Sequence, residues 1–139
     1  MKRSPLLHSE ISYLIAKLGH TQEVTVGDAG LPIPTGVQRI DLAVTPGLPD
    51  FISTLEAILS EMVVEGIFIA EQTRDQSPDF YAQLQGVIGR YEQTHRCHID
   101  QQWITHEDLK QRSQLSQAVI RTGECTPFAN VILQAGVAF

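Results

Sequence analysis

The apolar residues near the start of the chain recur every three to four positions, as they do along one face of a helix. The residues with this spacing are Ile11, Leu14, Ile15 and Leu18. Ser9 can cap such a helix and Gly19 can end it. Segment 50–62 has the same period, and we predict a second helix there.

Two later helices are marked by their first residues. Ser77 is followed by a proline, a pair typical of a helix start, and predicts a helix over about 78–95. Thr105 is followed three residues later by Asp108, which resembles a capping box with aspartate where Glu or Gln is usual. We predict a short helix here that ends near Leu115.

Six apolar runs between these helices are typical of strands. They are "EVTVGD" (23–28), "RIDLAV" (39–44), "VVEGIFIA" (63–70), "CHIDQQWI" (97–104), "QAVIRTGE" (117–124) and "NVILQAG" (130–136). The run 63–70 is apolar almost throughout, as in a strand that is buried on both faces. Because strands and helices alternate, we predict an α/β fold. It is a single three-layer domain over residues 1–139, with a mostly parallel sheet and helices on both faces.

Composition and charge narrow the classes of function. The formal net charge is -6, and no Lys/Arg cluster exceeds two residues, which argues against a nucleic-acid partner. No segment approaches the roughly 20 apolar residues of a membrane span. The first residues lack the long apolar run of a signal peptide, so we expect reduced thiols at Cys97 and Cys125 and a cytoplasmic location.

Three segments carry candidate chemistry, and each lies where a strand meets a turn or a helix. They are residues 19–34, 105–108 and 121–130. In open α/β sheets, ligands bind beyond the carboxyl ends of the strands. Asp28 ends the first predicted strand, and His106 follows the fourth.

Two histidines stand at predicted helix ends of opposite polarity. His20 follows a helix C-terminus, where the dipole favours the imidazolium, whereas His106 begins a helix, where the dipole favours the neutral ring. Groups whose pKa values are pushed apart are typical of acid–base chemistry. Plain structural roles are the alternative: a surface or capping role for either histidine, turn formation for Asp28, and satisfaction of a backbone group for Asn130.

Sequence motifs for bound cofactors are absent. The cluster "HRCH" at 95–98 matches no strong zinc pattern. Neither a GxGxxG nor a GxxxxGK[ST] motif occurs, which argues against dinucleotide and P-loop binding. We predict neither a cofactor nor a metal.

Four segments make the chain resemble the D-ribose pyranase family, which is related to the L-fucose mutarotases. They are "LGHTQEVTVGDAGLPIP", "RIDLAVTPGLPDF", "ITHEDLKQ" and "SQAVIRTGECTPFANVILQAGV". The resemblance implies a cytoplasmic enzyme that converts β-D-ribopyranose to β-D-ribofuranose without a cofactor. It also implies a homo-oligomer, a decamer of two stacked pentamers, with sites near subunit contacts.

The resemblance also assigns residues. The family's proton donor falls on His20, and its sugar-binding positions fall on Asp28, His106, Phe128, Ala129 and Asn130. The family usually has tyrosine where this chain has Phe128, so a hydroxyl group is lost there. Two alternatives therefore stay open: an L-fucose-type mutarotase, and a sugar-binding regulatory subunit without turnover.

Overall fold

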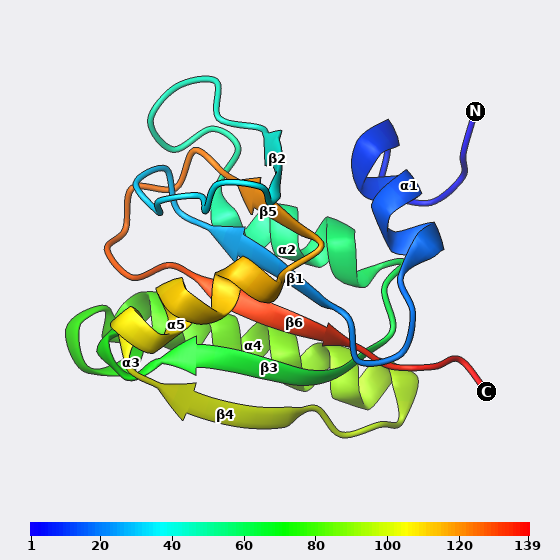
Figure 1. The fold of residues 1–139 in the computed structure, drawn as a ribbon. Helices are drawn as coiled ribbons and strands as arrows, with labels where there is room; N and C mark the ends of the chain where they lie inside the picture. Colours follow the sequence, from blue (N-terminus) through cyan, green and yellow to red (C-terminus); the bar gives the residue numbers. More distant parts are fainter.

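A six-stranded sheet in the order β2-β5-β1-β6-β3-β4 forms the centre of the computed structural model, which describes residues 1–139. The strands are β1 (Glu23–Gly27), β2 (Gln38–Asp41), β3 (Val64–Ala70), β4 (Asp100–Ile104), β5 (Ala118–Arg121) and β6 (Val131–Ala135). Neighbouring strands pair in parallel except at β6, which is antiparallel to both β1 and β3. Figure 1 shows the arrow of β6 pointing against those of β1, β3 and β4.

The direction of β6 defines the two edges of the sheet. The carboxyl ends of the five other strands meet the start of β6 at one edge, here called the carboxyl edge. The start of those strands and the end of β6 form the opposite, amino edge. Any residue between two elements can therefore be assigned to one edge from the topology alone.

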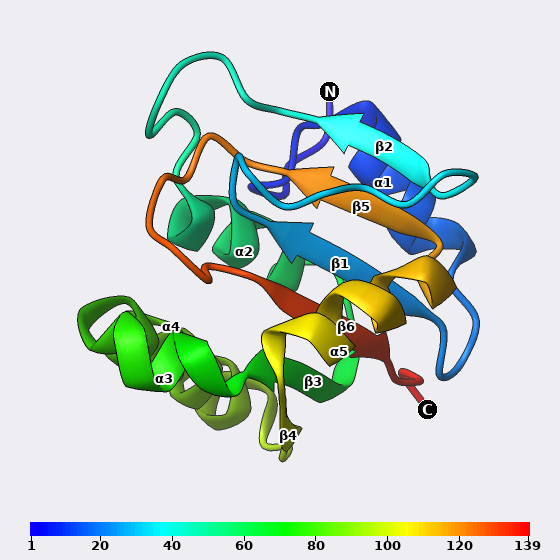
Figure 2. The ribbon, with the colours of Figure 1, turned by 60° about the vertical axis from the view of Figure 1, so that its left-hand side comes forward.

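Helices cover both faces of this sheet. The helices are α1 (Ser9–Lys17), α2 (Phe51–Leu59), α3 (Glu71–Gln76), α4 (Pro78–His95) and α5 (His106–Arg112), followed by a 3-10 turn at Ser113–Leu115. A large buried cluster joins α1, α2 and α4 to one face, and a smaller one joins Leu109 of α5 to the other. Figure 2 shows α5 in front of β1 and β6, with α1 and α2 behind. The predicted three-layer α/β fold is confirmed.

Most element predictions are confirmed, and the differences have local causes. Thr105 accepts the Asp108 N–H over 3.1 Å and caps α5 as predicted. The cap of α1 is His8 rather than Ser9, because His8 Nδ1 accepts the Ile11 N–H over 3.4 Å. Helix α3 was not predicted, because its N-cap Ala70 makes no side-chain hydrogen bond and so leaves no sequence signal. No helix is both long and apolar enough to cross a membrane.

Candidate active site

Asp28 and Asn130 hold each other at the carboxyl edge. Asp28 follows β1, and Asn130 precedes β6, which pairs with β1. The Asp28 N–H donates to Asn130 Oδ1 over 2.9 Å, and Asn130 Nδ2 donates to Asp28 Oδ2 over 2.9 Å. Asn130 is fully buried. The Asp28 carboxylate is thus oriented by a rigid partner, as a ligand-binding group must be.

The loop after β1 is fitted closely to this pair. The Gly30 N–H donates to Asp28 Oδ1 over 2.9 Å. A Cβ on Gly27 would lie 2.9 Å from Asn130 Oδ1 and 2.6 Å from Leu31 Cδ2, so only glycine allows the approach. The predicted turn role of Asp28 is therefore real, and its Oδ2 is also engaged by Asn130.

Glu124 organises the loop that leads to Asn130, a role that no sequence pattern predicts. Its Oε1 accepts the N–H groups of Cys125 and Thr126 over 3.1 and 3.0 Å, and its Oε2 accepts the Phe51 N–H over 3.2 Å. Burial acts to raise the pKa of Glu124, but these hydrogen bonds outweigh it and the pKa is lowered. The ionised carboxylate ties the loop to the start of α2.

Phe128 has a left-handed backbone, with φ of 62°. Its carbonyl accepts the Thr73 hydroxyl over 2.7 Å and the Asn130 N–H over 2.9 Å. A bulky residue in this conformation costs on the order of 1–3 kcal/mol, so the surrounding contacts must impose it. Ala129 packs in the core and is fully buried, and its N–H donates to the Thr126 carbonyl over 3.3 Å.

His106 lies beside Phe128 at the start of α5. The two rings meet edge to face, with centroids 5.0 Å apart at 85°. The His106 N–H donates to Gln72 Oε1 over 2.9 Å, a contact from the unpredicted helix α3. Burial lowers the pKa of His106, Lys110 adds to this, and Asp28 and Glu107 oppose it. A neutral ring was expected here, and burial, the largest cause of the lowered pKa, favours that form.

His20 lies at the amino edge, away from the other candidates. It precedes β1, whose five residues span about 16 Å at roughly 3.3 Å per residue. Its Nε2 lies 2.9 Å from both Glu65 Oε1 and Glu65 Oε2. Within one chain, the structure therefore gathers the five predicted sugar-binding residues at the carboxyl edge and leaves His20 at the other edge.

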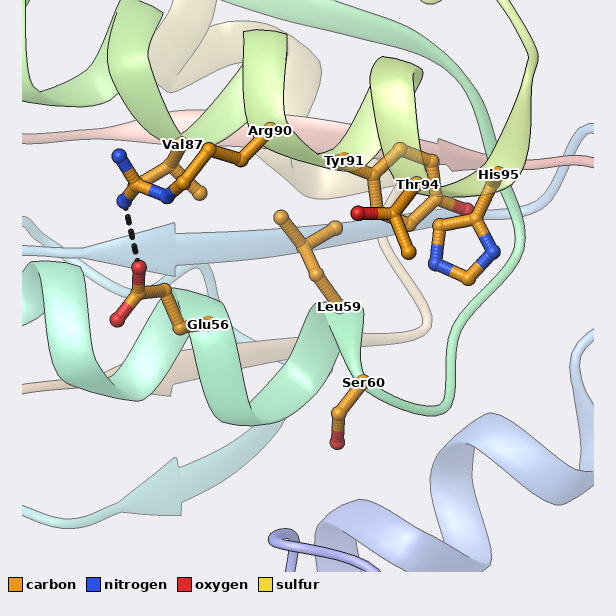
Figure 3. A pocket seen from close by; sticks show the side chains of 8 residues that line it. All are labelled: Glu56, Leu59, Ser60, Val87, Arg90, Tyr91, Thr94 and His95. Atoms are coloured by element: carbon orange, nitrogen blue, oxygen red, sulfur yellow. Dashed lines mark hydrogen bonds and ion pairs between the residues drawn. The ribbon is translucent and has the colours of Figure 1, made fainter.

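A separate hollow of about 190 Å³ lies between α2 and α4 (Figure 3). Arg90 of α4 donates across it to Oε1 of Glu56 on α2 over 2.7 Å, and the rings of Tyr91 and His95, both on α4, lie 4.4 Å apart. His95 belongs to the "HRCH" cluster, but no three His, Cys, Asp or Glu side chains gather closely enough to hold a metal ion. This hollow contains none of the candidate site residues.

Comparison with known proteins gives full-length matches. The profile of the RbsD / FucU transport protein family matches residues 1–138. The D-ribose pyranases of Vibrio vulnificus strain YJ016 and Aliivibrio fischeri strain MJ11 are 52% and 50% identical over 139 residues, covering 100% of each chain.

Solved structures agree with this match. Bacillus subtilis RbsD complexed with D-ribose has a TM-score of 0.88 at 39% identity, with 100% of both chains covered. The fucose mutarotase of Streptococcus pneumoniae, complexed with L-fucose, has a TM-score of 0.80 at 22% identity, also with 100% of both chains covered, which shows a shared fold. The chain belongs to the RbsD / FucU family.

Proposed function

We propose that this protein is an isomerase with D-ribose pyranase activity, which interconverts β-D-ribopyranose and β-D-ribofuranose. The observation that carries the proposal is the polar cluster at the carboxyl edge, where Asp28, Asn130 and His106 converge beside the Phe128 ring. Full-length identity of 52% to D-ribose pyranases supports ribose as the substrate.

The chemistry needs one proton given to the ring oxygen and one taken from the anomeric hydroxyl. In this proposal His20 is the donor, and Asp28 accepts hydrogen bonds from sugar hydroxyls. The neutral ring of His106 offers a further polar contact, and Phe128 packs against the C–H face of the sugar. Positioned acid–base groups contribute about 10²–10⁴-fold, which suits a reaction that already proceeds in water.

The separation of His20 from Asp28 supports a site shared between two copies of the chain. The two residues flank β1, about 16 Å long, and a pentose cannot touch both in one protomer. His20 of one copy would face the carboxyl edge of its neighbour. Such a head-to-tail contact forms a ring when the rotation between neighbouring copies closes. We therefore propose a homo-oligomer. The resemblance to the D-ribose pyranases implies that it is a decamer of two stacked pentamers in the cytoplasm, and we include both in the proposal.

The shared site can be tested by mixing subunits. Co-expressed His20→Ala and Asp28→Ala chains would form some interfaces that carry both intact residues, about a quarter of the total for random pairing. Each variant alone is expected to retain only a small residual activity, and the mixed assembly to recover part of the parent activity. A mixture as inactive as its components would place both residues in one chain and contradict the sharing.

Exchange-detected NMR on ribose distinguishes the proposed function from its two alternatives. Faster exchange between pyranose and furanose signals is expected with the unchanged protein, and slow exchange with His20→Ala. Acceleration for L-fucose alone would indicate the mutarotase alternative. This alternative is open because Phe128 lacks the hydroxyl of the tyrosine that is usual in the family. Ribose binding without any acceleration would indicate the regulatory subunit.

A further inference from the structure

A β-bulge in β3 places one extra residue opposite the end of β6. Val64 pairs with Ala135 and Gly66 with Gln134, so Glu65 has no partner in the register. Bulges redirect a side chain out of the alternation of a strand. The carboxylate redirected here is the one that contacts His20.

The surrounding backbone is shaped for this contact. A Cβ on Gly136 would lie 3.2 Å from Glu65 Cβ and 3.4 Å from Glu65 Oε2, so this glycine leaves room for the carboxylate. Thr21, next to His20, has φ of 67° and donates its N–H to the Ala135 carbonyl over 2.8 Å. The end of β6 therefore fixes both partners.

Stability does not account for this arrangement. The side chains of His20 and Glu65 are 53% and 38% exposed, and ion pairs at such positions contribute little to folding. A bulge, a strained threonine and a closely packed glycine all converge on one exposed contact. Such support is typical of functional groups that must be held in one orientation.

We propose that Glu65 is a positioning residue that keeps a proton on His20 Nε2 and so assigns Nδ1 as the nitrogen that reacts with ribose. The inference rests on the proposed role of His20 as proton donor. Both Glu65 oxygens lie 2.9 Å from Nε2, and a carboxylate can only accept, so Nε2 donates. Nδ1 is then the nitrogen with no partner on Glu65.

The proton balance follows from this assignment. Nδ1–H of the imidazolium gives its proton to the ring oxygen O5 as the C1–O5 bond breaks and leaves its electron pair on O5. The anomeric hydroxyl loses its proton to water as the C1 carbonyl forms. Addition of O4–H to C1 closes the furanose ring, with the carbonyl oxygen regaining a proton and Nδ1 recovering its own from O4.

Kinetics of Glu65→Gln test the assignment, with Glu56→Gln as the matched control. Glu56 is another half-exposed carboxylate in an ion pair, with Arg90, remote from the site. In Glu65→Gln we expect the exchange rate at saturating ribose to fall about 10–100-fold, as for other groups that orient a histidine, with ribose affinity within about twofold. Glu56→Gln should match the parent. An unchanged rate, or a loss confined to affinity, would overturn the proposal.

A double-variant cycle separates positioning from a direct role. In a His20→Ala background, Glu65→Gln should lower the residual exchange rate no further, because its effect passes through the imidazole. A further loss of similar size would show that Glu65 acts on ribose by itself.

Nitrogen-15 NMR of the His20 ring gives a readout that needs no turnover. The neutral ring of the parent should carry its proton on Nε2, and Glu65→Ala should populate both tautomers. A parent ring protonated on Nδ1, or identical ring signals in the variant, would overturn the assignment. If the parent fails to accelerate ribose exchange, the proposed function fails, and these ring signals alone decide the role of Glu65.

Discussion

Asn130 and Asp28 form a reciprocal pair across the start of β6 and the end of β1. The Asn130 amide accepts the Asp28 N–H through Oδ1 and donates through Nδ2 to Asp28 Oδ2, both over 2.9 Å. A buried amide with both functions engaged is a rigid support. The carboxylate that we assign to sugar binding is therefore preorganised before any ligand arrives.

Asp28→Asn should weaken ribose binding more than it lowers stability. Losing a charged hydrogen bond to the sugar costs about 1.5–3 kcal/mol, or roughly tenfold or more in Kd. The amide of the variant has one acceptor oxygen instead of two, so it loses the hydrogen bond either from Asn130 Nδ2 or from the Gly30 N–H. This loss lowers the free energy of unfolding by about 0.5–1.5 kcal/mol. Calorimetric titration and urea unfolding measure the two effects. Asp75→Asn, which changes an exposed carboxylate, is the control. If Asp28→Asn binds ribose as tightly as the parent, Asp28 has only its role in the turn.

Phe128→Tyr should leave the exchange rate on ribose equal or raise it. The backbone of Phe128 is held by Thr73, so the new ring keeps its direction beside His106. A hydroxyl that reaches the sugar gains about 0.5–1.5 kcal/mol, whereas one buried without a partner costs roughly 1–3 kcal/mol. Exchange rates on ribose and on fucose should be measured for the parent and for the Phe128→Tyr variant. A large loss on ribose would indicate a site rebuilt around phenylalanine.

The lowered pKa of His106 predicts a pH dependence of stability. Burial holds this pKa below the ordinary value near 6.5, which applies to the unfolded chain. At a pH between the folded-state and unfolded-state pKa values, the unfolded chain therefore binds more protons than the folded one. The contribution of neutral His106 to the free energy of unfolding is complete above about pH 6.5 and is lost as the pH falls towards the folded-state pKa. Urea unfolding of the parent and of His106→Gln from pH 7.5 down to 5 should show a shallower decline in the variant. Parallel curves would contradict this prediction.

Gly123→Ala should destabilise the protein strongly, and Gly89→Ala should not. A Cβ on Gly123 would lie 2.4 Å from the Leu48 carbonyl oxygen, which is backbone and cannot turn aside. Overpacking of this kind costs about 1–3 kcal/mol or more. Gly89 lies within α4 with nothing near its Cβ position, so alanine there should stabilise by about 0.5–1 kcal/mol. Equal unfolding midpoints for the two variants would contradict the close approach at Leu48.

The sequence predicts the elements that carry their own signals. Helix α4 begins at Pro78 and ends at His95 as predicted, because its start is marked by Ser77 and Pro78. Helix α3 could not be predicted, since Glu71–Gln76 is short, polar and without a capping side chain. The reversed direction of β6 is also invisible locally, because an apolar strand has the same pattern in either direction.

Some residues of the candidate site can be predicted from the ends of the strands, whereas others can be identified only from the register in which the strands pair. The rule that ligands bind at carboxyl ends places Asp28 and His106 at one edge, and the structure confirms that placement. Glu65 falls inside the predicted strand 63–70, and only the register of β3 against β6 reveals it as a bulge. The side chains of Gln72 and Glu124 accept backbone N–H groups of His106 and Phe51, contacts that no residue pattern predicts.

The central position of β1 affects how the chain folds during synthesis. Val24 pairs with Ala118 on one side and with Leu133 on the other, so both neighbours of the first strand come from much later in the chain. At 5–20 residues per second, β1 leaves the ribosome roughly 5–20 s before its partners. The sheet cannot close around β1 until β5 and β6 have been synthesised, and the apolar side chains of β1 must avoid aggregation during that time.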